Sequence, residues 1–146
     1  MQFPPSIKVF GSKEFRDPKC PSETSEQVTF FNVLRQLRPE LGAIAVHPRN
    51  EGKRSWGQVA RQKAEGMTKG ASDIIIPGSP AFVCELKRKD HTKSRLEIEQ
   101  TDYLLACQNM GAFACIALGW EGAMEAVNDW SKKGEESAIT PEMVLK

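Results

Sequence analysis

Three polar side chains interrupt an otherwise apolar stretch, "SDIIIPGSPAFVCELKRK", which covers residues 72–89. These are Asp73, Glu85 and Lys87, two carboxylates and an ammonium. Side chains alternate between the two faces of a β-strand, so Glu85 and Lys87 share one face if "AFVCELK" is a strand. The stretch therefore predicts a buried platform that carries charged groups on one side.

The four residues "PGSP" between "SDIII" and "AFVCELK" predict a β-hairpin. If these four form the turn, Ile76 pairs with Ala81, and a slip of one residue brings Asp73 beside Glu85. Two carboxylates that close repel each other and raise a pKa unless a cation lies between them. A divalent metal resolves this, because Mg²⁺ takes carboxylate and carbonyl oxygens and keeps water ligands.

Other interpretations of these residues stay open. Glu-x-Lys in a strand is often a solvent-facing ion pair that contributes little stability. Aspartate before a strand is often only a turn residue. Two polar residues in predicted helices strengthen the case for a site, because both interrupt apolar stripes at helical spacing.

The first of these is Glu26. Thr24 and Gln27 indicate a capping box at the start of a helix over residues 24–37. Its apolar stripe is Phe30, Val33, Leu34, Leu37 and Leu41. Extending the stripe back by four residues places Glu26 on the buried face, where a carboxylate needs a cationic partner.

The second is Gln100. Ser94 and Glu97 indicate another capping box, and Gly111 fits the end of that helix. The stripe of this helix is Leu96, Gln100, Tyr103, Leu104 and Cys107, with the polar Gln100 in the middle.

The remaining elements complete an α/β chain of one domain. Residues 1–22 contain four prolines and are interpreted as an irregular N-terminal arm. A short strand is predicted at 43–46, a loop and short helix up to Gly66, a buried strand at 112–118 and a helix at 121–130. Residues 131–146 are interpreted as a polar C-terminal tail, which leaves 23–130 as the domain proper.

Composition narrows the class of protein. A hydrophobic fraction of 40% and a charged fraction of 27% are typical of soluble globular domains. No apolar run approaches the ~20 residues of a membrane span, and the N-terminus lacks a signal-peptide layout. The four cysteines form no CxxC pair and no zinc-like spacing, which favours a reduced, intracellular protein.

Charge is unevenly distributed along the chain. Residues 47–95 hold 11 Lys/Arg against 5 Asp/Glu, and residues 96–146 hold 3 against 9. A basic segment of this kind fits a polyanionic partner, and an unevenly charged solvated surface is the alternative.

Asp73 followed by Glu85-Leu86-Lys87 resembles the D-(x)n-(E/D)-x-K signature of the PD-(D/E)XK nuclease superfamily. The order helix, strand, hairpin, helix, strand also resembles the αβββαβ core of that superfamily, a mixed central sheet flanked by helices. Within it the chain most resembles the VRR-NUC (virus-type replication-repair nuclease) family. Glu26, "HPRN", "KGASD", "VCELK" and Gln100 support this, while Ser72 departs from the proline of the motif's name.

The resemblance implies a site that binds Mg²⁺ or Mn²⁺ and no small-molecule cofactor. Asp73, Glu85 and the main-chain carbonyl of Leu86 would hold the metal, with Glu26 completing or supporting the site. Lys87 would orient the attacking water and stabilise charge on the phosphate. Gln100 would hydrogen-bond near Lys87 or the metal-bound water.

Basic residues on both sides of the hairpin are candidate DNA phosphate contacts. They are Arg49, Lys53, Arg54, Arg61, Lys63, Lys69, Arg88, Lys89, Lys93 and Arg95. For each of them a solvated surface charge is the alternative. Trp56 is a candidate for base stacking, although a core or dimer-face position is favoured. His47 and His91 are interpreted as structural or surface residues.

The sequence thus predicts a metal-dependent DNA endonuclease that hydrolyses phosphodiester bonds. The resemblance implies branched DNA such as four-way junctions as substrate, a role in DNA repair or recombination, and the cytoplasm of a bacterial or phage-infected cell. A homodimer is expected, because two sites are needed to cut two strands, and no membrane contact is expected. The alternatives are a non-catalytic DNA-binding or assembly protein with the same fold, and a sequence-specific restriction-type endonuclease.

Overall fold

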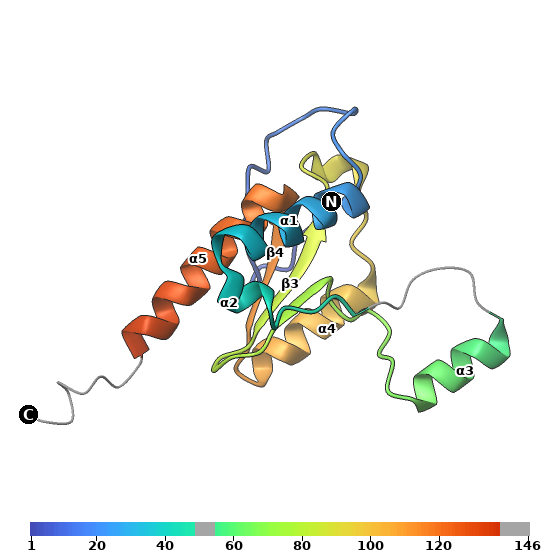
Figure 1. Ribbon diagram of the computed structural model, residues 1–146. Helices are drawn as coiled ribbons and strands as arrows, with labels where there is room; N and C mark the ends of the chain where they lie inside the picture. The colour runs from blue at the N-terminus through green and yellow to red at the C-terminus, as the bar shows by residue number, and fades with distance from the viewer. Residues whose placement is uncertain (49–54, 138–146) are drawn as a thin grey trace, which may run out of the picture.

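A computed structural model describes residues 1–48 and 55–137, with side chains described up to residue 134 (Figure 1). The strands are β1 (Lys8–Phe10), β2 (Ile74–Ile76), β3 (Phe82–Lys87) and β4 (Phe113–Leu118). The helices are α1 (Glu23–Leu37), α2 (Pro39–Gly42), α3 (Trp56–Ala64), α4 (Ile98–Asn109) and α5 (Gly119–Ser137), with a 3₁₀ turn at His91–Lys93. Arg49, Lys53 and Arg54 lie outside the described residues.

The sheet has the order β1-β4-β3-β2 and is mixed. β2 and β3 form the predicted antiparallel hairpin, and β3 pairs in parallel with β4. β1 pairs in parallel with the outer side of β4. The predicted mixed sheet flanked by helices is confirmed.

Helices cover both faces of the sheet (Figure 1). On one face, Phe30 and Leu34 of α1 and Val127 of α5 pack with the even-numbered side chains of β3. On the other face, Leu104 of α4 packs with Val83 of β3 and with β4. The alternation of β3 therefore separates an α1/α5 layer from an α4 layer, as the period-2 pattern predicts.

Several sequence-based boundaries are wrong. The first 22 residues are not entirely irregular, because Lys8–Phe10 forms β1, and Ile7, Phe10 and Cys20 are buried. The strand predicted at 43–46 is reduced to one antiparallel bridge between Val46 and Ile75. The last helix continues to Ser137, into the segment interpreted as tail.

Both predicted capping boxes are shifted. The N-cap of α1 is Ser22, which accepts from the main-chain N–H of Ser25, so α1 begins before Thr24. α4 begins at Ile98, and Gln100 accepts from the main-chain N–H of Glu97 at its N-terminus. Within residues 1–48 and 55–137, no helix combines the length and apolar character that crossing a membrane requires.

Candidate active site

The hairpin brings Asp73 and Glu85 together. Ile76 pairs with Phe82 and Ile74 pairs with Cys84, so the next pair along the ladder is Asp73 and Glu85. The one-residue slip considered from the sequence is therefore the register that forms. Beyond the effect of burial, the two carboxyl groups are close enough that Asp73 raises the pKa of Glu85.

Asp73 is also fixed to the main chain of β3. Its Oδ2 accepts from the N–H of Leu86 at 2.8 Å. In a β-strand the N–H and C=O of one residue point to the same side. The carbonyl of Leu86 therefore lies on the side of Asp73, where the resemblance places a metal-ligating oxygen. His47 Nδ1 lies 2.8 Å from the main-chain oxygen of Asp73 and braces the hairpin's open end.

Lys87 is buried at the centre of the polar cluster, with 2% of its surface exposed. Its Nζ lies 3.5 Å from Glu85 Oε1, and it donates to Gln100 Oε1 at 3.1 Å and to the main-chain oxygen of Arg95 at 2.5 Å. Gln100 thus lies beside Lys87, as the interrupted stripe of α4 predicts. These acceptors hold the ammonium in one position.

Glu23, not Glu26, is the carboxylate of α1 that lies in this cluster. Glu23 Oε1 is 3.5 Å from Lys87 Nζ, and Glu23 Oε2 accepts from Ser94 Oγ at 3.2 Å. Through Glu23, the first turn of α1 therefore reaches Lys87 at the end of β3. Ser94 also accepts from the N–H of Arg88, so it ties Glu23 to the end of β3 rather than capping α4.

Glu26 is buried as predicted, but against a different partner. Its Oε2 accepts from the main-chain N–H of Trp120 at 2.6 Å, at the N-terminus of α5. Gly119 makes room for this contact, because a Cβ there would lie 3.3 Å from Glu26 Oε2, and its φ is +79°. The positive end of α5 supplies the favourable charge that the sequence argument required. The structure does not join Glu26 to Asp73, Glu85 or Lys87.

The electrostatics of the cluster are unfavourable for ionised carboxylates. Burial raises the pKa of Glu85 well above its ordinary value, the neighbouring charge of Asp73 raises it further, and Lys87 opposes both. Burial also raises the pKa of Asp73 and of Glu23. Glu85 Oε2 is buried and accepts no hydrogen bond from a described residue. An orphaned carboxylate oxygen of this kind is a place where a cation can bind.

The donors present fit a hard divalent cation. Asp73, Glu85 and the carbonyl of Leu86 supply the oxygen ligands that Mg²⁺ and Mn²⁺ prefer. Across the described part of the chain, no three His, Cys, Asp or Glu side chains are grouped closely enough to hold a metal by themselves. Two carboxylates and one carbonyl would leave coordination positions for water and for a phosphate oxygen.

The predicted basic residues fall into two groups. Arg61, Lys63, Lys69, Lys93 and Arg95 are exposed, and Lys69 pairs with Glu99 at 3.0 Å. The side chains of Arg88 and Lys89 instead contact other parts of the protein. Arg88 donates to the main-chain oxygens of Cys20 and Pro21, and Lys89 lies 3.6 Å from Glu121 and over the ring of Phe15.

The arginine contact links the N-terminal segment to the cluster. By binding the carbonyl of Pro21, Arg88 fixes the chain two residues before Glu23. Asp90, which is 1% exposed, accepts from the N–H of Asp17 and reinforces the same attachment. These contacts favour a positioning role for Arg88 over the phosphate contact predicted from the sequence.

Sequence reasoning missed Glu23, Ser94 and His47 as members of the site. Glu23 lies seven residues before Phe30 and so shares the stripe that pointed to Glu26. The N-cap signal at Ser22 indicates that Glu23 begins the helix. Ser94 and His47 act through long-range contacts for which the sequence offers no local signal.

The fold is similar to that of a solved structure described as a VRR_NUC domain protein. The two share a TM-score of 0.65 and 20% sequence identity over 80% of this chain and 93% of that chain. No model of a protein family matches the sequence, and no curated protein matches it. The chain therefore has a VRR-NUC-like fold, as the resemblance of its motifs predicts.

Proposed function

We propose that the chain is a divalent-metal-dependent endodeoxyribonuclease that hydrolyses phosphodiester bonds at the Asp73–Glu85–Lys87 cluster. The observation that carries the proposal is the buried Glu85 carboxyl, one oxygen of which has no hydrogen-bond partner among the described residues. Stability alone disfavours such a group. Buried, unsatisfied ionisable groups that cost folding free energy are found most often in catalytic sites.

In this mechanism Asp73, Glu85 and the Leu86 carbonyl would hold Mg²⁺ or Mn²⁺. A bound ion of this kind lowers the pKa of its water and polarises the phosphodiester. Lys87, fixed by Gln100 and by the carbonyl of Arg95, would orient the attacking water and donate to the phosphate oxygen on which charge develops. Glu23 and Ser94 would keep Lys87 and the end of β3 aligned.

The DNA substrate is expected to bind across the exposed Arg61, Lys63, Lys69 and Lys93 through its phosphates. Branched DNA, a role in repair or recombination, a homodimer and a cytoplasmic location remain part of this proposal. A non-catalytic DNA-binding or assembly protein is the second candidate. It is less favoured, because the buried Lys87 and the Asp73–Glu85 pair would have no use in it.

Cleavage of labelled linear, flapped and four-way DNA in Mg²⁺, Mn²⁺ or EDTA tests the proposal. We expect cutting that requires the metal and that is lost in Lys87→Ala, while binding to DNA in Ca²⁺ persists. DNA binding without cleavage in either metal, on any of the three substrates, would support the non-catalytic alternative instead.

A further inference from the structure

A polar hollow lies beside the candidate active site, between α1 and the segment that follows α2. Its volume is about 300 Å³, at the lower end of the range of about 300–1,000 Å³ that is usual for ligand sites. Four of the side chains that line it are polar, and all four can donate hydrogen bonds. The lining includes Gln27, Asn32 and Arg35 of α1, His47, and the apolar Phe31 and Ala45. A hollow with this lining is suited to an anionic ligand that also has hydrogen-bonding groups.

Helix α1 leads from the Asp73–Glu85–Lys87 cluster to this hollow. Glu23, at the start of α1, lies 3.5 Å from the Nζ of Lys87. Gln27 and Phe31 follow Glu23 at intervals of four residues and so lie on the same side of the helix. At about 1.5 Å per residue, residues 27–35 lie roughly 6–18 Å along the helix from Glu23. One DNA strand advances about 3.4 Å per nucleotide, so this span corresponds to about two to five nucleotides.

His47 joins the opposite wall of the hollow to the hairpin. Its Nδ1 lies 2.8 Å from the main-chain oxygen of Asp73. A carbonyl oxygen only accepts, so Nδ1 donates this hydrogen bond. The bridge between Val46 and Ile75 places the same segment along β2, which is the last strand of the sheet. The hollow therefore begins at the edge of the sheet, at a residue that contacts Asp73.

Packing holds the guanidinium of Arg35 at the hollow. The guanidinium lies over the ring of Phe31, 5.4 Å from its centroid. Gly42 of α2 allows a close approach to the stem of Arg35, because a Cβ at Gly42 would lie 2.8 Å from the Cγ of Arg35. The side chain of Arg35 is nevertheless exposed. A positioned, exposed guanidinium is well suited to bind a phosphate through two parallel hydrogen bonds.

We propose that this hollow binds a nucleotide of the DNA strand that crosses the Asp73–Glu85–Lys87 cluster, about two to five nucleotides from the scissile phosphate. Arg35 binds the phosphate of this nucleotide, and Gln27 and Asn32 form hydrogen bonds with its sugar or base. Contacts of this kind position a strand over a site. The inference rests on the proposed function, because it takes the cluster as the place where the DNA strand is held.

Binding of a labelled flapped DNA in Ca²⁺, measured by fluorescence anisotropy at several salt concentrations, tests the site. Arg35→Gln should raise the dissociation constant about tenfold, the usual effect of losing one hydrogen bond to a charged group. It should also reduce the slope of log Kd against log salt concentration by about 0.7–0.9, the value for one phosphate contact.

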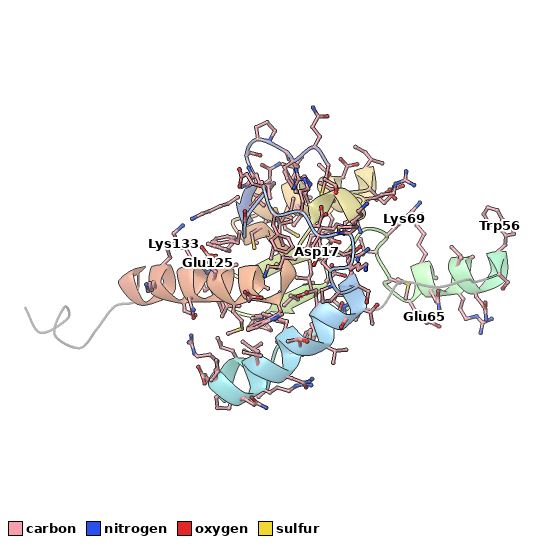
Figure 2. All side chains as sticks on the ribbon, turned by 90° about the horizontal axis from the view of Figure 1, so that it is seen from above. Asp17, Trp56, Glu65, Lys69, Glu125 and Lys133 are labelled. Atoms are coloured by element: carbon pink, nitrogen blue, oxygen red, sulfur yellow. The ribbon has the colours of Figure 1, made fainter. Side chains whose placement is uncertain are left out.

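Lys133→Gln is the matched control for Arg35→Gln. Lys133 is also an exposed cation on a helix, and its Nζ lies over the ring of Phe113. Figure 2 shows Lys133 pointing from α5 away from α1. We expect this control to bind DNA like the wild type, with the same dependence on salt.

Asn32→Asp is a second, independent variant. It keeps the size of the side chain but places a negative charge beside the bound phosphate, so it should also weaken binding. Asn128→Asp, at an exposed position of α5, should bind normally. All four variants should melt like the wild type, because all four side chains are exposed.

Methylphosphonate substitution identifies the phosphate that Arg35 binds. The cut position is mapped in Mg²⁺, and uncharged methylphosphonates are placed singly at about two to five nucleotides from it. One of them should weaken binding by the wild type. The same substitution should have no further effect in Arg35→Gln, because the two changes remove the same contact.

The proposal is overturned if Arg35→Gln binds DNA like the wild type, or if Lys133→Gln weakens binding as much as Arg35→Gln does. Methylphosphonates that act equally on the wild type and Arg35→Gln overturn it as well. These outcomes differ from failure of the nuclease proposal, in which the wild type does not cut. Weaker binding by Arg35→Gln in a protein that does not cut would support the hollow as a DNA site and contradict only the nuclease proposal.

Discussion

Carboxylates are buried on both sides of the sheet, but only one side satisfies them. On the α1/α5 side, Glu26 accepts a short hydrogen bond from the N-terminus of α5 and has a complementary dipole beside it. On the α4 side, Glu85 faces Asp73, keeps one oxygen without a partner, and has its pKa raised by burial. The first arrangement contributes stability, whereas the second costs stability, a cost that the proposed metal ion would offset.

The two carboxylates of α1 sharpen this contrast because they are only three residues apart. Glu23 reaches the end of β3, where Lys87 and Ser94 hold it. Glu26 turns toward Trp120. Glu23 and Glu26 are therefore one helical turn apart but differ in role, since the first contacts the candidate site and the second stabilises the fold. Mutations of the two should have different effects.

The largest effect is expected at Lys87. Lys87→Ala should lower the rate of DNA cleavage by about 10²–10³-fold, the usual loss when one donor to a developing negative charge is removed. Lys89→Ala is the matched control, because the ammonium of Lys89 contacts Glu121 and Phe15 and not the Asp73–Glu85–Lys87 cluster. Single-turnover cleavage should be nearly unchanged in the control. Equal losses in the two variants would mean that neither lysine acts on the phosphate.

Glu23→Gln and Glu26→Gln should have opposite consequences. We expect Glu23→Gln to lower cleavage by about 10–100-fold, as for other residues that orient a metal-site group, with little change in melting temperature. Glu26→Gln keeps an acceptor for Trp120 but loses the charge facing α5. It should cut normally and lose about 1 kcal/mol, or about 2–4 °C in melting temperature.

Calorimetric melting and cleavage of both variants, side by side, check this pair of predictions. If Glu26→Gln abolished cutting while Glu23→Gln cut normally, the assignment of the two residues would be reversed.

Metal-free stability should depend on pH through Glu85. Its pKa in the folded state is raised by burial, so the folded protein binds this proton more tightly than the unfolded chain does. The stability contributed by the protonated group is present at low pH and is lost as pH rises through the folded-state pKa. Glu85→Gln carries no such proton. In EDTA it should melt near the wild type at acidic pH and above it at alkaline pH.

Scanning calorimetry compares the melting temperatures of Glu85→Gln and the wild type. The scans run from about pH 5 to about pH 9, around the range where most domains are folded. Adding Mn²⁺ should raise the melting temperature of the wild type most at alkaline pH, because binding requires the ionised carboxylates. A variant that melts below the wild type across the whole range would indicate that the Glu85 carboxylate is well satisfied without a metal.

The smallest effect is expected at Ser94, which contacts the site only through Glu23 and the N–H of Arg88. Ser94→Ala should cost about 1 kcal/mol of stability, the usual net value of a hydrogen bond. Cleavage should fall less than in Glu23→Gln, because Lys87 still holds Glu23. A larger loss than in Glu23→Gln would show that Ser94 has a contact of its own with substrate.

Local patterns in the sequence were sufficient to predict the platform of the site. The "PGSP" turn and the alternation of "AFVCELK" correctly indicated the hairpin and the face shared by Glu85 and Lys87. Gln100 was found because it interrupts a helical stripe. The sequence does not decide the register to better than one residue, because a turn of four or five residues fits it equally well.

The rest depended on long-range contacts. Periodicity pointed only to Glu26, although Glu23 fits the same stripe. Which of the two contacts Lys87 depends on the packing of α1 in the fold. β1 is hidden in a proline-rich segment, because three residues form a strand only by pairing with β4. The contact of His47 with the main chain of Asp73 likewise joins segments that are 26 residues apart.

Calorimetric titration with Mn²⁺ tests the central claim most directly, using wild type, Asp73→Asn and Glu26→Gln without DNA. The contrast between the two sides of the sheet predicts equal binding by the wild type and Glu26→Gln, with release of protons on binding, and loss of binding in Asp73→Asn. Absence of binding in the wild type, or equal binding in all three proteins, would contradict a metal site at Asp73 and Glu85.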